Sequence, residues 1–175
     1  PVGFKNGTNG TVQIAIDGIR SAAHPHHFLA VTKQGLAAIA ATRGNPACHV
    51  ILRGGNTGPN YDADSVRAVA AQLSAAGLPE RIMIDLSHAN SDKDHARQPA
   101  VAEAVARQLE GGSPCVLGVM MESFLEDGRQ DHERSEQLVY GQSITDACMS
   151  WETTAAVLRK SRERLAEVLP GRRAP

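Results

Sequence analysis

Three short apolar runs recur along the chain at a nearly constant interval, and each ends in a basic, acidic or histidine side chain. The runs lie within residues 48–55, 81–90 and 114–123, and the corresponding residues Arg53, His88 and Glu122 are 35 and 34 positions apart. Short, β-branched runs that are apolar on successive residues are typical of strands buried on both faces of a parallel sheet. Because the interval is that of one βα unit, the sequence predicts a doubly wound sheet or a (β/α) barrel.

Helical patterns alternate with these runs, and a further apolar run at residues 1–7 precedes them. The predicted helices cover residues 11–23, 62–77, 98–112 and 145–169. In the last of these, the candidate buried positions are Met149, Ala156, Leu158, Leu165 and Val168. The first connection is longer, and its residues 26–45 are interpreted as an inserted β-hairpin around Lys33-Gln34-Gly35. We therefore expect four βα units with one inserted hairpin.

Composition narrows the class of protein. Apolar residues make up 42% of the chain, charged residues 21%, and the net charge is −1, as in ordinary globular proteins without a basic surface for nucleic acid. No apolar run approaches the roughly 18 residues of a membrane helix, and no signal peptide is evident. Cys48, Cys115 and Cys148 are too widely spaced for a disulfide framework or a zinc knuckle. We expect a cytoplasmic protein with neither membrane nor nucleic-acid partners. The start at Pro1, directly on a predicted strand, indicates a fragment.

Charged and metal-binding side chains follow the predicted strands. Lys5, Arg53, His88 and Glu122 stand where the strands end, and Asp146 lies in the polar loop after the last strand. Functional groups of parallel βα proteins gather at this end, so we expect the five side chains to converge. The two cations suit a phosphate and a carboxylate, whereas an imidazole with two carboxylates suits a divalent metal.

Each of these residues also has a structural interpretation. His88 can be a hydrogen-bonded strand-end residue, and Lys5 and Arg53 can be solvated charges on the rim. Asp146 can cap a helix that starts near Ala147. Glu122 follows a buried strand, where a carboxylate needs a partner. The histidines of residues 24–27 fit no metal motif and are interpreted as a loop.

Six segments together resemble the class I 3-deoxy-D-arabino-heptulosonate 7-phosphate (DAHP) synthases. They are "PVGFKNGTNGT", "VTKQG", "HVILRGGNTGPNY", "MIDLSHANSDKDH", "GVMMESFLEDGRQ" and "YGQSITDACMSWE", and they cover almost the whole chain in order. The resemblance implies a (β/α)8 TIM barrel, of which residues 1–175 form the C-terminal half. It also implies a metal-dependent transferase that condenses phosphoenolpyruvate with erythrose 4-phosphate, releasing phosphate, in the first step of the shikimate pathway to aromatic amino acids.

The resemblance assigns a role to each candidate residue. Lys5 and Arg53 would hold phosphoenolpyruvate through its phosphate and carboxylate. His88, Glu122 and Asp146 would be three of four ligands of a divalent metal (Mn, Fe, Co or Zn) that polarises the aldehyde of erythrose 4-phosphate.

The resemblance also leaves parts of the site unmatched. The fourth ligand in the family, a cysteine, and its Lys-Pro-Arg-Thr-Thr and Gly-Ala-Arg segments have no counterpart in this sequence. We therefore expect the isolated chain to be inactive unless a second chain completes the site. Asp85, Ser87 and Asn90 are expected to support the ring of His88 and the local backbone.

The sequence also leads to expectations about binding partners and about alternative functions. The unpaired edges and open apolar face of a half-barrel predict a chain that self-associates as a homo-oligomer or is ordered only as part of a larger assembly. In feedback-regulated members the hairpin at residues 26–45, which contains Phe28, helps to form a pocket for an aromatic amino acid effector; the alternative is a hairpin that only packs against a neighbouring subunit. Two other functions stay open, namely a Schiff-base aldolase using Lys5 and a non-catalytic binding or regulatory module.

Overall fold

A four-stranded parallel sheet forms the centre of the protein in the computed structural model, which describes residues 1–133 and 137–172. The strands are β1 (Val2–Lys5), β4 (Cys48–Leu52), β5 (Ile82–Asp85) and β6 (Val116–Met120). Their spatial order, β1-β4-β5-β6, follows their order in the chain, and all neighbours are parallel. A doubly wound sheet reverses its strand order, so this topology is consistent with part of a barrel.

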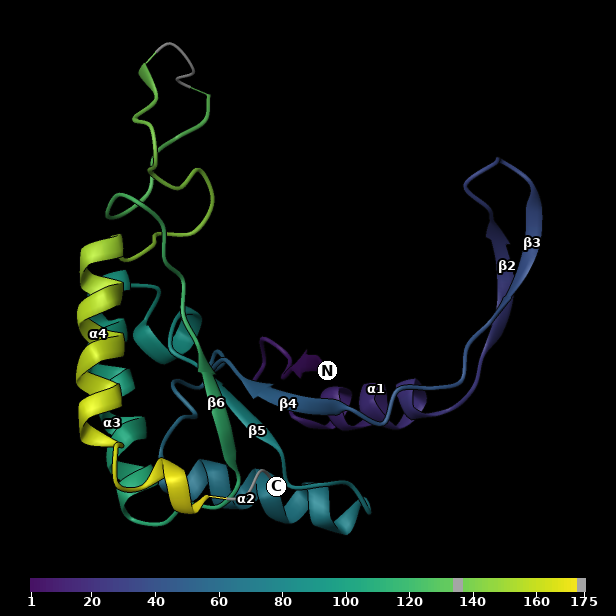
Figure 1. The fold of residues 1–175 in the computed structure, drawn as a ribbon, viewed down its shortest axis with the longest axis horizontal. Coiled ribbons are helices and arrows are strands. Elements are labelled where there is room, and N and C mark those ends of the chain that lie inside the picture. Colours follow the sequence, from purple (N-terminus) through teal and green to yellow (C-terminus); the bar gives the residue numbers. More distant parts are fainter. Residues whose placement is uncertain (134–136, 173–175) are drawn as a thin grey trace.

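Each strand of the central sheet is followed by a helix, with β2 and β3 intervening after α1. The helices are α1 (Gln13–Ala23), α2 (Ala63–Ala75), α3 (Gln98–Glu110) and α4 (Trp151–Arg164). Short 3₁₀ helices lie at His88–Ser91, His95–Arg97 and Leu169–Gly171. Figure 1 shows α3 and α4 side by side along one flank of the sheet. None of the described helices is long and apolar enough to cross a membrane.

The core lies between the sheet and these helices. Val50, Ile51 and Leu52 are buried in succession on β4, which explains why this strand is apolar on successive residues. Ile82 and Ile84 are fully buried on β5. In contrast, Leu117 on β6 is 39% exposed, so the sheet is less covered towards this edge strand.

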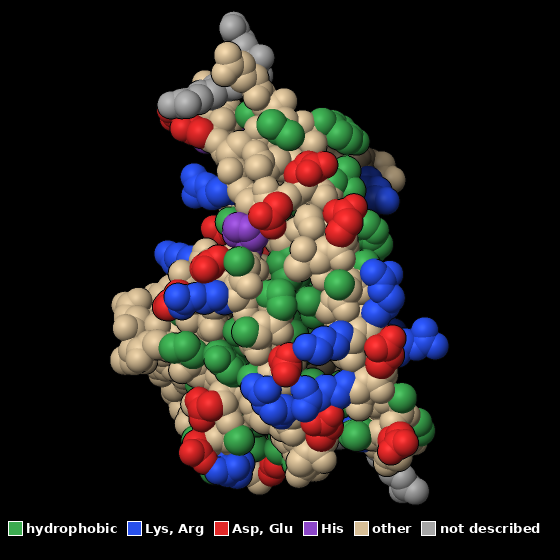
Figure 2. All heavy atoms as spheres, turned by 90° about the vertical axis from the view of Figure 1, so that its left-hand side faces the viewer, with side chains coloured by type: hydrophobic (Ala, Val, Ile, Leu, Met, Phe, Trp, Pro, Cys, Tyr) green, Lys and Arg blue, Asp and Glu red, His purple; other side chains and the backbone are tan. Residues whose placement is uncertain are grey.

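The outer flank formed by α3 and α4 carries mixed charges, which Figure 2 shows from the front. Lys160 Nζ lies 2.7 Å from Glu103 Oε2, and an Arg164 guanidinium nitrogen lies 2.7 Å from Glu110 Oε2. These ion pairs link α3 to α4 at the protein surface. Because surface ion pairs are screened by water, each contributes little to stability.

Strands β2 (His27–Val31) and β3 (Ala37–Ala41) form a separate antiparallel ribbon within residues 26–45. In Figure 1 this ribbon projects far from the central sheet. Phe28, Leu29 and Ile39 are exposed on it, Leu29 by 86%. The ribbon therefore presents apolar side chains that the described part of the chain does not cover.

The predicted start of the last helix is wrong. Helix α4 begins at Trp151 rather than near residue 145, and Ser150 is its N-cap, accepting a hydrogen bond from the amide of Thr153. The preceding Cys148 instead exchanges backbone hydrogen bonds with Gly128 in the loop after β6. Those bonds hold the segment in an extended form that cannot join the helix.

The predicted burial along this helix is also partly wrong. Met149 and Leu165 are buried and Val168 packs against the core, as expected. Ala156 and Leu158 are exposed instead, because the helix turns Val157 inward.

Candidate active site

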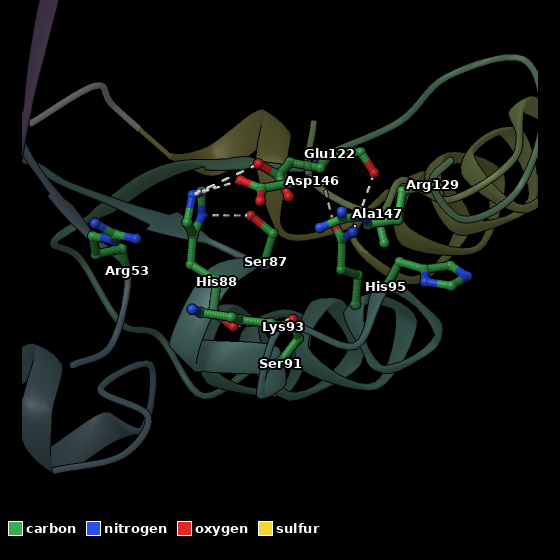
Figure 3. A pocket seen from close by; sticks show the side chains of 11 residues that line it. Arg53, Ser87, His88, Ser91, Lys93, His95, Glu122, Arg129, Asp146 and Ala147 are labelled. Carbon is green, nitrogen blue, oxygen red and sulfur yellow. Dashed lines mark hydrogen bonds and ion pairs between the residues drawn. The ribbon is translucent and has the colours of Figure 1, made fainter. Parts of the chain in front are cut away.

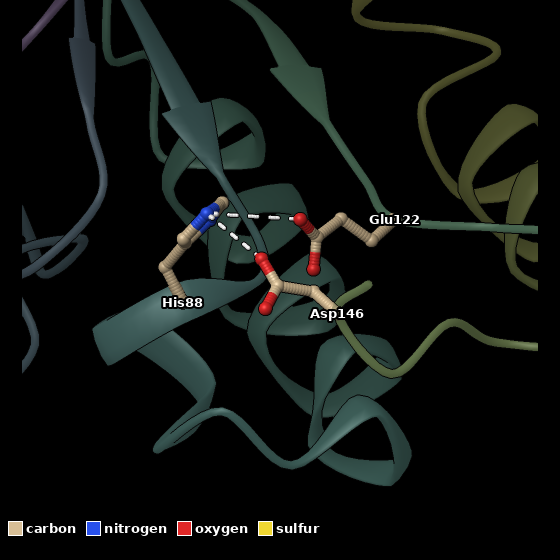
Figure 4. A group of neighbouring side chains, drawn as sticks. All are labelled: His88, Glu122 and Asp146. Carbon is tan, nitrogen blue, oxygen red and sulfur yellow. Dashed lines mark ion pairs between the residues drawn. The ribbon is translucent and has the colours of Figure 1, made fainter. Parts of the chain in front are cut away.

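Three predicted metal ligands meet at the carboxyl ends of β5 and β6 (Figure 4). His88 begins the 3₁₀ helix after β5, Glu122 lies two residues beyond β6, and Asp146 comes from the loop before α4. His88 Nε2 is 3.6 Å from Glu122 Oε1 and 3.8 Å from Asp146 Oδ2. One ligand atom from each residue lies within 4.8 Å of the others, so the three side chains can hold one metal ion.

The electrostatics of this cluster favour a cation. Burial raises the pKa of Glu122, and the neighbouring carboxylates of Asp146 and Asp85 raise it further, against the opposing effects of His88 and Lys5. Ionisation of Glu122 therefore costs free energy, because its carboxylate is partly buried and lies near other negative charges. A divalent cation between Glu122 and Asp146 would remove that repulsion.

Asp85 fixes the orientation of the His88 ring. Its carboxylate is fully buried, and Oδ2 lies 2.9 Å from His88 Nδ1. Ser87 Oγ donates to Asp85 Oδ1 at 2.6 Å and also lies 2.8 Å from His88 Nδ1. A carboxylate at Nδ1 favours the tautomer with its proton there, which leaves the lone pair of Nε2 facing Glu122 and Asp146.

The same carboxylate binds Lys5. Lys5 Nζ donates to Asp85 Oδ2 at 2.9 Å. Burial alone would raise the pKa of Asp85, but hydrogen bonds from Lys5 and Ser87 bring it below its ordinary value. One buried, ionised carboxylate therefore connects the predicted anion-binding lysine at the end of β1 to the predicted metal-binding histidine after β5.

A pocket of about 300 Å³ opens beside the three predicted ligands (Figure 3). The lining residues are Arg53, Ser87, His88, Ser91, Lys93, His95, Gln98, Glu122, Arg129, Asp146 and Ala147. Four of the five predicted site residues belong to this set, whereas Lys5 is not among the lining residues and reaches the site through Asp85.

Three asparagines fix the backbone at Arg53. Asn6 Oδ1 accepts from the Arg53 amide at 2.8 Å, and Asn60 Oδ1 accepts from the Gly54 amide at 2.7 Å. Asn90 Nδ2 donates to the carbonyls of both Leu52 (3.0 Å) and Asp85 (2.7 Å), joining the ends of β4 and β5. Side chains at strand ends thereby replace the sheet hydrogen bonds that stop there.

Several of the lining residues were not predicted from the sequence. Among them, Lys93 and Arg129 add positive charge to the pocket. His95 also lines the pocket, and its Nε2 lies 3.0 Å from Asp127 Oδ2. Lys93 lies five positions after His88 in the same loop, so its neighbourhood could have been inferred. No local pattern marked Arg129, which reaches the pocket through the path of the loop after β6.

The alternative role of Asp146 as a helix cap is not observed, because Ser150 caps α4. Among the cysteines, Cys48 and Cys115 are buried, as expected of small apolar residues, whereas Cys148 is half-buried two residues from Asp146. Burial raises the pKa of the Cys148 thiol, which favours its neutral form.

Comparison with known proteins gives a consistent family. A model of the DAHP synthetase I family matches residues 1–159. The chain is 55% identical over 177 aligned residues to the tyrosine-inhibited phospho-2-dehydro-3-deoxyheptonate aldolase of Schizosaccharomyces pombe, covering 99% of this chain and 46% of that protein. It is 52% identical to the Phe-sensitive aldolase of the same name from Escherichia coli, covering 99% of this chain and 48% of the relative.

Structural comparison agrees with the sequence comparison. The solved structure of phospho-2-dehydro-3-deoxyheptonate aldolase from Francisella tularensis superposes with a TM-score of 0.87 at 47% identity, covering 98% of this chain and 48% of that chain. The chain thus spans about half the length of the curated relatives it matches. With a family match over residues 1–159 and a matching fold, the chain belongs to the DAHP synthetase I family.

Proposed function

We propose that the chain acts within a metal-dependent DAHP synthase, a transferase that joins phosphoenolpyruvate to erythrose 4-phosphate and releases phosphate. The observation that carries the proposal is the convergence of His88, Glu122 and Asp146 within 4.8 Å, beside a pocket that Arg53 also lines. The proposed reaction is taken from the family to which the chain belongs. The positions of His88, Glu122, Asp146 and Arg53 are suited to that reaction.

The donor set fits a divalent metal. One imidazole nitrogen and carboxylate oxygens are ligands for Mn, Fe, Co and Zn alike, so the choice among these four stays open. Glu122 and Asp146 bring negative charge that a cation neutralises, and the Asp146 side chain is 65% exposed towards solvent. A bound metal would act as a Lewis acid on a carbonyl oxygen.

The cations of the site suit an anionic substrate. The planar guanidinium of Arg53 can form a bidentate contact with a phosphate or a carboxylate, while Lys5 offers a point charge. Lys5 is already paired with the buried Asp85 carboxylate at 2.9 Å. That pairing favours a positively charged lysine that attracts an anion over a neutral amine that forms a Schiff base with a substrate.

The topology supports a barrel role for the sheet. We propose that the four βα units form the second half of a (β/α)8 barrel, with β2 and β3 as its inserted hairpin and residues 1–175 as part of one barrel domain. The edge strands β1 and β6 would then pair with other strands of the barrel.

The exposed ribbon suits an interface or an effector site. Phe28, Leu29 and Ile39 are exposed on β2 and β3, as expected for a surface that another subunit covers in a homo-oligomer. Relatives named as tyrosine-inhibited and phenylalanine-inhibited support an aromatic amino acid effector. We propose that the exposed ribbon contributes to the pocket for that effector.

Turnover by the full-length protein tests the proposal. The assay follows phosphate release from phosphoenolpyruvate and erythrose 4-phosphate in the presence of Mn²⁺. We expect His88→Ala to abolish metal-dependent turnover with an unchanged circular dichroism spectrum. His132→Ala is the matched control, because its side chain is 69% exposed and is not among the residues that line the pocket. Turnover retained by His88→Ala would overturn the assignment.

A further inference from the structure

A buried glutamine contacts the backbone of Glu122. Gln98 opens helix α3, and its side chain is fully buried, although glutamine is usually exposed. Its Nε2 donates to the Glu122 carbonyl at 3.1 Å, and its Oε1 accepts from the Glu122 amide at 3.0 Å. The side-chain amide of Gln98 thus forms hydrogen bonds with both backbone polar groups of Glu122, its carbonyl and its N–H.

These two bonds continue the sheet pairing beyond the end of β6. The last backbone bond from the β5 side is donated by the Leu86 amide to the Met120 carbonyl at 2.8 Å. At Glu122 the partners change to Gln98 on one side and the Met149 amide, 3.0 Å from the Glu122 carbonyl, on the other. The backbone that aims the Glu122 side chain at His88 is therefore held from two directions.

Gln98 is itself held by the segment that carries His88. The connection between β5 and β6 begins with the 3₁₀ helix His88–Ser91 and leads through His95–Arg97 into α3. Helix α3 contacts both short helices, and the Gln98 amide donates to the His95 carbonyl. Val101 and Val105 on the same helix are buried in the core. The side-chain amide of Gln98 thus connects the segment that carries His88 to the backbone of Glu122.

We propose that Gln98 is a positioning residue that sets the distance between Glu122 and His88 for metal binding; this role rests on the metal site of the proposed function. Gln98→Met keeps the length of the side chain but removes both hydrogen bonds. The Glu122 amide then loses its bond to Gln98, and the carboxylate loses its fixed aim. Loss of a partner that orients a ligand typically weakens metal binding about 10- to 100-fold.

The experiment measures Mn²⁺ affinity by competition with a chromogenic chelator, with thermal unfolding followed in parallel. Gln108→Met is the matched control, because Gln108 lies on the same helix and its Nε2 donates to the Tyr61 carbonyl at 2.6 Å. We expect Gln98→Met to bind Mn²⁺ about 10- to 100-fold more weakly, and Gln108→Met to bind it as the unsubstituted protein does. Gln98→Asn, whose shorter arm cannot make both bonds, should weaken binding in the same direction.

Hydrogen exchange gives a second readout that does not depend on a bound metal. The Glu122 amide should be protected in the metal-free protein, and Gln98→Met should accelerate its exchange more than that of core amides such as Ile84. Equal Mn²⁺ affinity in Gln98→Met and Gln108→Met, or an unprotected Glu122 amide in the unsubstituted protein, would overturn the positioning role alone. Mn²⁺ affinity that His88→Ala leaves unchanged would instead overturn the metal site, and the role of Gln98 with it.

Discussion

Replacing Asp85 with asparagine should destabilise the protein strongly, because this carboxylate is fully buried and accepts or pairs with four groups. Lys5 Nζ and His88 Nδ1 both lie 2.9 Å from Oδ2, and the Ser87 hydroxyl and amide lie 2.6 Å and 2.9 Å from Oδ1. Asparagine can keep the two bonds at Oδ1. At the other position its amide group would point two hydrogens at Lys5 and His88, which are themselves donors.

The size of the effect follows from these contacts. Removing one partner of a buried ion pair costs about 3–5 kcal/mol, because the other charge stays buried and uncompensated. The Lys5 side chain is 34% exposed and can turn towards water, which lowers the cost. We therefore expect Asp85→Asn to reduce the free energy of unfolding by roughly 2–3 kcal/mol at neutral pH.

Urea unfolding followed by circular dichroism measures this change. The matched control is Asp64→Asn, whose partner Arg67 and own side chain are 70% and 86% exposed, so its effect should stay below about 0.5 kcal/mol. Because the folded pKa of Asp85 is lowered, its contribution is present above the unfolded pKa and disappears as pH falls through the folded pKa. A loss below about 1 kcal/mol at neutral pH, or one equal to that of the control, would show that Asp85 does not stabilise the fold through these buried contacts.

Three further substitutions have defined outcomes. Gly54→Ala should lower stability by about 1–3 kcal/mol in urea unfolding, because φ is +72° and the new Cβ would lie 2.8 Å from the Ala89 backbone. Asp62→Ala should cost about 1 kcal/mol at neutral pH by removing the N-cap of α2; since hydrogen bonds from Ser65 lower the pKa of Asp62, the difference should vanish as pH falls through that pKa. Ile84→Ala, at a fully buried position, should lower the unfolding midpoint by an amount equivalent to about 2–5 kcal/mol.

The order of elements could be predicted from the sequence because the central strands β4 and β5 are apolar and largely buried, and each ends abruptly in polar residues. Ile82 and Ile84 carry that signal in β5, and helix α2 shows its N-cap Asp62 before an apolar period. The start of α4 could not be predicted, since Cys148 pairs with a distant loop residue, Gly128, and local patterns contain no information on that pairing.

The site could be predicted where it depends on strand ends. His88, Glu122 and Asp146 were expected to converge, and they do lie together. The ion pair from Lys5 to Asp85 was not expected, because the two residues are 80 positions apart and meet only through the sheet. The contact of Gln98 with Glu122 could not be predicted either. Within a helical pattern Gln98 is an ordinary polar residue, and only the tertiary fold places it against Glu122.

Anomalous difference density from a crystal of the protein soaked in Mn²⁺ would show whether His88, Glu122 and Asp146 hold a metal ion. We expect one strong peak within about 2.0–2.3 Å of His88 Nε2 and of an oxygen from each of Glu122 and Asp146. A peak that contacts other residues instead, or no density between these three side chains, would show that they do not form the metal site.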